Sequence, residues 1–255
     1  RVAFDISEPQ PLAWMFTKNE DNSLYDEAVK FFGKIKENGE LTRMIEHAYG
    51  HVDNLNYVGT IVFRRHVAQR LPAFEALFKK YGQQNGLDWR LLVAMSYQES
   101  LLKANAKSST GVRGLMMLTR KTSKDLGIKN RLDPESSIEG GARYFTQLHK
   151  RMPKDIREPD KTWMALAAYN VGFYHVIDAR IITKKRGLDP NSWIDVKTSL
   201  PLLAQRKWYK DTKYGYARGW EPVRYVENIR SYYDSLRRDS RHDDQVVPDP
   251  DLSLI

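Results

Sequence analysis

Glu99 is the residue in this sequence whose type and position best suit proton transfer. It lies near the end of a predicted helix, Trp89–Leu102, for which Asp88 is the expected N-cap. Leu92 and Met95 precede it by seven and four residues, so helical geometry places the carboxyl on an apolar stripe. Desolvation raises the pKa of a carboxyl, and a general acid working near neutral pH needs a raised pKa. Position alone leaves a structural salt bridge open as the alternative.

The stretch after Glu99 contains no second carboxylate before Asp125. It holds four lysines and two arginines, which form either a solvated face or a surface that attracts an acidic ligand. A small, polar segment leads into Gly111–Leu118, which indicates backbone brought close to another group. The sequence therefore predicts one carboxyl followed by a closely approaching loop.

The composition limits the kind of protein. The chain has 255 residues, 41% of them hydrophobic, which allows one large domain or one domain plus a fragment. Without cysteine, and with six histidines that show no HExxH-like spacing, it is predicted to bind no metal and no cofactor. The net charge of +9 implies an acidic partner. Nucleic acid is not the predicted partner, because no zinc-finger, RNP-like or basic-region pattern is present.

The hydrophobic periodicity predicts a mainly α protein without βαβ alternation or repeats. We expect residues 1–50 (one strand and two helices) to be the end of an upstream domain or a docked segment, since they cannot bury their own apolar faces. Residues 51–69 are predicted to be a linker, 70–238 a helical domain, and 239–255 a disordered tail. No run approaches eighteen apolar residues, and the chain begins at Arg1, so we expect a processed or shortened product lacking any export signal or lipid anchor.

Four segments together resemble one family. They are Glu99-Ser100 at a helix end, Gly111–Leu118 after a polar loop, Ala168-Tyr169-Asn170 at another helix end, and Tyr225–Ile229. In this order they resemble the lytic transglycosylases with a goose-lysozyme-like catalytic domain, and within them the membrane-bound lytic murein transglycosylase F type. The resemblance covers roughly residues 70–238.

The resemblance implies a lysozyme-like helical domain of the goose-type and soluble lytic transglycosylase kind. A short α/β remnant of a periplasmic solute-binding-like domain would precede it over residues 1–50. The implied reaction cleaves the β-1,4 bond between N-acetylmuramic acid and N-acetylglucosamine in peptidoglycan strands, without water, and leaves a 1,6-anhydromuramoyl end. The implied location is the periplasm of a Gram-negative bacterium, peripheral to the outer membrane, with any membrane association through parts missing from this chain.

The resemblance also implies roles for individual residues. Glu99 takes the catalytic position, as acid to the leaving oxygen and then as base to the muramic C6 hydroxyl. Ser108 is expected near the muramic N-acetyl group, while Tyr169 and Asn170 are expected to line the cleft. Tyr225 is expected to form a hydrogen bond near Glu99.

Met117 departs from the family pattern, which usually has glutamine at this position after Gly-Leu-Met. It is counted among the substrate-binding positions, although methionine here also suits a core position. The aromatic residues between Trp208 and Trp220 either stack on sugar rings or pack internally, and the sequence does not decide between these two uses.

The absence of a second carboxylate bears on the reaction. Ordinary glycosidases use two, about 5–5.5 Å apart when retaining and about 6.5–9.5 Å apart when inverting. One carboxyl suffices if the substrate's acetamido group stabilises the cation and an internal hydroxyl replaces water. Two alternatives stay open: a hydrolytic muramidase in which Glu139 or Asp160 holds water, and a catalytically weak peptidoglycan-binding module.

Overall fold

The protein is described by a computed structural model that covers residues 14–17, 21–49 and 57–245. Over these residues the regular structure is helical and no strand is present, which confirms the predicted mainly α class. The α-helices are α1 (Ser23–Glu37), α2 (Glu40–Tyr49), α3 (Tyr57–Arg70), α4 (Glu75–Asn85), α5 (Trp89–Ser100), α6 (Arg120–Asp125), α7 (Pro134–Arg151), α8 (Asp160–Val171), α9 (Phe173–Lys185), α10 (Trp193–Ser199), α11 (Arg206–Tyr209) and α12 (Trp220–Gln245). Two short 3₁₀ helices, Leu71–Ala73 and Leu200–Ala204, complete them.

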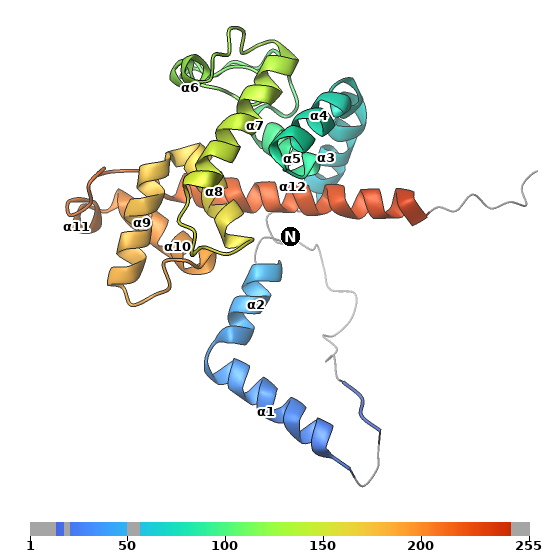
Figure 1. Cartoon of the computed structure of the whole chain (residues 1–255), viewed down its shortest axis with the longest axis vertical. Coiled ribbons are helices and arrows are strands. Elements are labelled where there is room, and N and C mark those ends of the chain that lie inside the picture. Colours follow the sequence, from blue (N-terminus) through green and yellow to red (C-terminus); the bar gives the residue numbers. More distant parts are fainter. Residues whose placement is uncertain (1–13, 18–20, 50–56, 246–255) are drawn as a thin grey trace, which may run out of the picture.

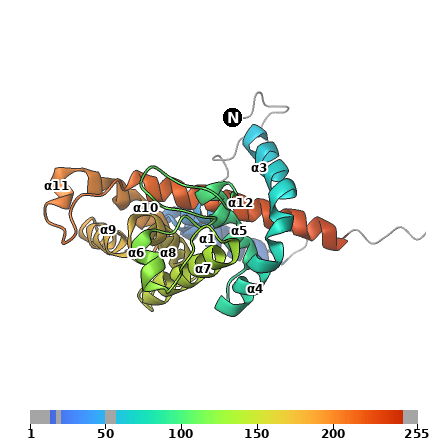
Figure 2. The ribbon, with the colours of Figure 1, turned by 90° about the horizontal axis from the view of Figure 1, so that it is seen from above.

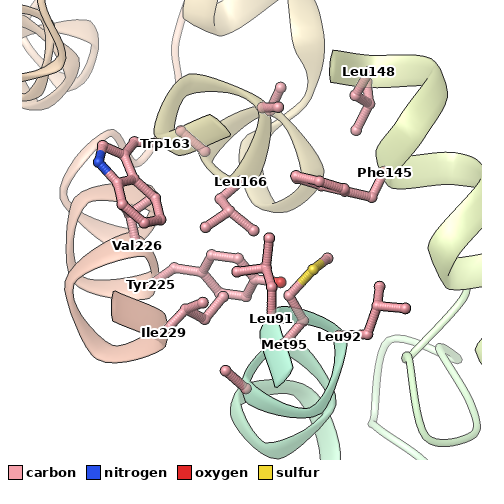
Figure 3. Packing of buried hydrophobic residues seen from close by; sticks show 14 of the residues in the cluster. Leu91, Leu92, Met95, Phe145, Leu148, Trp163, Leu166, Tyr225, Val226 and Ile229 are labelled. Carbon is pink, nitrogen blue, oxygen red and sulfur yellow. The ribbon is translucent and has the colours of Figure 1, made fainter. Parts of the chain in front are cut away.

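Helix α5 lies at the centre of the core. It begins as predicted, because the Asp88 side chain accepts a hydrogen bond from the Arg90 backbone N–H at 2.9 Å. Its middle is buried all round, with Leu92 and Met95 fully inaccessible, as expected for a helix enclosed by others. Figure 3 shows these side chains meeting apolar side chains from α7, α8 and α12. The helix that carries Glu99 is therefore held rigidly.

Helix α12 is a long helix that crosses much of the helical domain in both ribbon views (Figures 1 and 2). It packs against α5 and α8 through Tyr225, Val226 and Ile229, which recur at helical spacing and are all buried. The helix continues to Gln245, so the disordered tail predicted from residue 239 is wrong up to residue 245. Residues 246–255 lie outside the described part.

The predicted linker is also wrong over residues 57–69, which belong to α3. Phe63 anchors this helix, because its ring contacts the rings of Tyr97 and Tyr232 with centroids 4.7 and 4.8 Å away and is 1% exposed. Arg64 also pairs with Asp239 of α12 at 2.7 Å. The prediction missed the helix because its apolar residues do not form one clear stripe. Residues 51–56 lie outside the described part.

Helices α1 and α2 lie below the helices that surround α5 in Figure 1. Their apolar side chains are largely uncovered: Leu24, Val29, Phe31, Met44 and Ile45 are each at least half exposed. The strand expected near the start of the chain falls on residues 1–13, outside the described part. The α/β remnant of an upstream domain therefore stays a prediction.

Candidate active site

Glu99 and Tyr225 meet at the boundary between α5 and α12. The Tyr225 hydroxyl donates a hydrogen bond to Glu99 Oε1 at 2.7 Å, although the two residues are far apart in the chain. Tyr225 is 5% exposed, whereas Glu99 is half-buried. Glu99 Oε2 has no hydrogen-bond partner within the described chain. One carboxyl oxygen is thus fixed by the protein and the other is left for a ligand.

Burial raises the pKa of Glu99 from 4.5 to about 7, and the hydrogen bond from Tyr225 opposes part of this rise. Its place in the last turn of α5 acts in the same direction as burial, since a helix C-terminus repels negative charge. No cation pairs with Glu99 among residues 57–245, so the alternative of a structural salt bridge is wrong there. No second carboxylate there shifts its pKa either. Glu99 is therefore a lone carboxyl that titrates near neutral pH.

Hydrogen bonds hold the loop 101–119 against the end of α5. The Ser96 and Ser100 hydroxyls both donate to the backbone oxygen of Leu115, at 3.1 and 2.9 Å. On its other side, Arg131 Nη1 donates to the backbone oxygens of Gly111 and Leu118 at 2.9 and 2.8 Å. These bonds satisfy carbonyl groups that a loop would otherwise leave unpaired. They fix the loop's path relative to Glu99.

Three non-glycine residues adopt left-handed backbone in the described part of the chain, and all of them border this site. Leu101 and Leu102 directly follow Ser100 with φ of 54° and 58°, and Met117 has a φ of 46°. Such conformations cost about 1–3 kcal/mol each and persist where surrounding contacts impose them. Leu102 is held by its burial, and Leu101 by the bond from Arg70 Nη1 to its oxygen at 2.7 Å. The backbone thus adopts strained conformations where it turns sharply after Glu99, the candidate catalytic residue.

Tyr169 closes the site from the end of α8. Its hydroxyl donates to the backbone oxygen of Met116 at 2.9 Å, which connects α8 to the loop. Burial and the nearby charge of Glu99 raise the pKa of the Tyr169 phenol, so the hydroxyl keeps its proton. The Tyr144 ring of α7 lies against it, with centroids 5.2 Å apart. Tyr169, Tyr225 and Glu99 therefore form one cluster, in which the expected hydrogen bond between Tyr225 and Glu99 is present. The expected role of Tyr169 in lining a cleft stays a prediction.

The other three predicted site residues form no hydrogen bond with Glu99 within residues 57–245. Ser108 lies in the loop, where its hydroxyl shares a hydrogen bond with Thr110 Oγ1 at 2.8 Å. Asn170 is exposed beside Tyr169. Met117 is half-buried, whereas its chain neighbours Met116 and Leu118 are buried, so its burial does not decide between a core and a cleft position. A role for these three side chains in binding stays a prediction.

Sequence reasoning missed the residues that hold the loop. Ser96 precedes Ser100 by one helical turn, and two small hydroxyl residues on one buried face could have indicated a backbone partner. Arg131 and Tyr144 gave no local signal, because their partners lie 13 to 25 residues away. Only the fold brings them to the site.

Tyr225→Phe is expected to raise the pKa of Glu99 above its value of about 7. The hydroxyl stabilises the charged carboxylate, and phenylalanine removes that donor while leaving the ring in the core. The pKa can be followed by ¹³C NMR of the carboxyl carbon, assigned with Glu99→Gln. Tyr233→Phe is a matched control, because its hydroxyl donates to Asp88 at the other end of α5. An unchanged or lower pKa in Tyr225→Phe would contradict this account of the site.

Comparison with known proteins agrees with this geometry. The sequence model of the family described as the Transglycosylase SLT domain matches residues 76–191, which contain Glu99, the loop and Tyr169. A membrane-bound lytic murein transglycosylase F from Ectopseudomonas mendocina is 55% identical over 236 residues, which are 92% of this chain and 48% of that protein. The protein of the same name from Marinobacter nauticus is 56% identical over 236 residues, covering 92% and 47%.

The chain thus spans about half the length of the curated relatives that it matches. Among solved structures, the 70 kDa soluble lytic transglycosylase of Escherichia coli aligns with 76% of this chain and 29% of its own, at 20% identity and a TM-score of 0.47. The family assignment below rests on the sequence match of residues 76–191 and not on this structural similarity. Residues 76–191 of this chain belong to the transglycosylase SLT domain family.

Proposed function

We propose that this chain cleaves peptidoglycan strands without water, at the β-1,4 bond between N-acetylmuramic acid and N-acetylglucosamine, and leaves 1,6-anhydromuramoyl ends. The observation that carries the proposal is the lone carboxyl of Glu99, with a pKa of about 7 and an unpartnered Oε2. Family membership of residues 76–191 and the names of the similar proteins support the same reaction class.

The reaction needs one group that first gives and then takes a proton. Protonated Glu99 gives its proton to the glycosidic oxygen as the bond from that oxygen to muramic C1 breaks. The substrate's own acetamido oxygen stabilises the positive charge at C1. The Glu99 carboxylate then takes the proton of the C6 hydroxyl, whose oxygen bonds to C1. A pKa near neutrality suits both steps, because the protonated and the charged form of Glu99 are then both populated near neutral pH.

The neighbouring residues position these groups. Tyr225 holds Oε1 and thereby directs Oε2 toward the substrate. Tyr169 fixes the loop through the Met116 oxygen, and the held C6 hydroxyl acts as an intramolecular nucleophile, which is a large source of rate. Ser108 and Asn170 are proposed to contact the N-acetyl group and the cleft sugars. Met117, in place of the family's glutamine, contributes apolar contact and no amide hydrogen bond.

A hydrolytic muramidase has less support. Asp160, one candidate for holding water, begins α8 and accepts a hydrogen bond from the Trp193 N–H at 2.8 Å. Nine residues separate it from Tyr169, or about 13 Å along the helix axis. Glu139, the other candidate, pairs with Arg143 at 3.0 Å. A module that only binds peptidoglycan would not need a carboxyl with a raised pKa.

We also propose that the protein works in the bacterial envelope, in the periplasm at the outer membrane. The relatives' names describe membrane-bound murein enzymes, which supports an envelope location. Within the described part of the chain, no helix has both the length and the apolar character to cross a membrane.

The products of peptidoglycan digestion test the proposed reaction. Purified sacculi incubated with this chain should release muropeptides ending in 1,6-anhydromuramic acid, which are one water lighter than the corresponding reducing ends. Mass spectrometry distinguishes the two, and a hydrolytic muramidase digest of the same sacculi supplies the reference. Reducing ends alone would replace the proposal with hydrolysis, and no soluble product would favour the binding module.

A further inference from the structure

A group of aromatic rings and one arginine lies on the surface beside the end of α7. The Arg151 guanidinium stacks on the Phe173 ring at 4.1 Å and lies 5.4 Å from the Tyr174 ring. Tyr174 stacks in turn on Tyr214, with centroids 4.3 Å apart and planes within 18°. Although packed together, the two tyrosines remain 47% and 38% exposed. We call Arg151, Phe173, Tyr174 and Tyr214 the arginine–tyrosine surface.

Arg151 has no carboxylate partner within residues 57–245, and it is exposed. Stacking on Phe173 holds its guanidinium plane while leaving the N–H groups at the edge of that plane available. A planar, oriented guanidinium binds a carboxylate through two parallel hydrogen bonds. Lys213, whose ammonium lies 5.6 Å from the Tyr214 ring, adds a second positive charge to the same surface. The chemistry of this surface therefore favours an anionic, partly apolar ligand.

The surface continues from the candidate active site. Tyr144 precedes Arg151 by seven residues, so both project from one face of α7, about 10 Å apart along the helix axis. Tyr144 contacts Tyr169, and the nearby charge of Glu99 contributes to the raised pKa of Tyr169. Phe173 and Tyr174 in turn begin α9, directly after the helix that carries Tyr169. A strand bound at Glu99 would therefore have neighbouring units near Arg151.

We propose that the arginine–tyrosine surface binds a carboxylate of the peptide stems carried by the glycan strand, and that the chain thereby prefers peptide-bearing strands over bare ones. This inference rests on the proposed function, because it takes peptidoglycan as the polymer. The stems supply carboxylates next to short alkyl groups. Arg151 matches the former, and the exposed rings of Tyr174 and Tyr214 match the latter.

The test compares two soluble substrates: glycan strands with their peptide stems, and the same strands after an amidase has removed the stems. We expect Arg151→Gln to lower the ratio of the two kcat/KM values, stem-bearing over bare, by about 3- to 5-fold, the effect of one exposed charge pair. Lys150→Gln is the matched control, since it removes the same charge from the adjacent, differently directed position of α7. Tyr214→Ala should also lower the ratio, because it removes the ring stacked on Tyr174.

A ratio that is unchanged in Arg151→Gln, or lowered equally in Lys150→Gln, would overturn the inference. An equal fall of activity on both substrates would also overturn it, since a structural role alone produces that result. High ionic strength should reduce the preference of the wild-type chain, because it screens an exposed charge pair. Failure of the proposed function is a separate outcome, in which the wild-type chain forms anhydro ends from neither substrate.

Discussion

Glu99→Gln should lower the rate of anhydromuramoyl formation by about 10³-fold or more, because in the proposed reaction this one residue performs both proton transfers and each contributes about 10²–10⁴-fold. Glutamine keeps the shape of the side chain and can still accept the hydrogen bond from Tyr225, but it has no acidic proton. Glu99→Asp tests position instead of chemistry. It keeps the acid but withdraws it by one methylene, and a misplacement of about 1 Å can cost about 10²-fold.

The measurement is the release of anhydro ends from sacculi, with Glu139→Gln as the matched control. Glu139 is a carboxylate already paired with Arg143, so its loss should change the rate little. Folding can be checked by thermal unfolding. Glu99→Gln should be at least as stable as the wild type above pH 7, because it removes a charge whose burial is unfavourable. Substantial anhydro product from a folded Glu99→Gln protein would show that another group carries the chemistry.

The helix that carries Glu99 could be predicted because its signals are local. Asp88 caps it through a backbone N–H two residues away, and Leu92 and Met95 define its buried face within the same helix. The raised pKa followed from the same pattern, since a carboxyl on an apolar stripe must lose hydration. The identity of Tyr225 as its partner did not follow from periodicity. It came from the resemblance to a family, because 126 residues separate the two side chains.

The two boundary errors have one physical cause. In both segments the local pattern of a packed helix is weak: the apolar residues of α3 form no single stripe, and the end of α12 is rich in polar residues. Each is stabilised by contacts with a distant segment: Phe63 by aromatic rings of α5 and α12, and Asp239 by Arg64. Tertiary contacts of this kind override weak local preference. A prediction from one sequence has no access to them.

Gly114→Ala should destabilise the protein by about 4 kcal/mol, through the combined costs of left-handed backbone and overpacking. Gly114 is buried with a φ of +85°, and an added Cβ would lie 1.8 Å from the backbone oxygen of Arg131 and 2.7 Å from Ser137 Oγ. The backbone oxygen cannot turn aside as a flexible side chain would. The backbone at Gly114 and the backbone at Arg131 must therefore move apart. This movement displaces the loop 101–119, which Arg131 binds at Gly111 and Leu118.

Gly111→Ala provides the matched control, because its φ is +84° but no atom lies within 4 Å of the added Cβ. It should cost only about 1–2 kcal/mol, the penalty of the left-handed conformation itself. Urea unfolding of both variants therefore separates backbone strain from steric overlap at nearly the same φ. Equal destabilisation of the two would contradict the close packing of Gly114 on Arg131. Gly114→Ala should also lose activity in its folded fraction, because the Met116 oxygen that Tyr169 binds lies two residues further along the same loop.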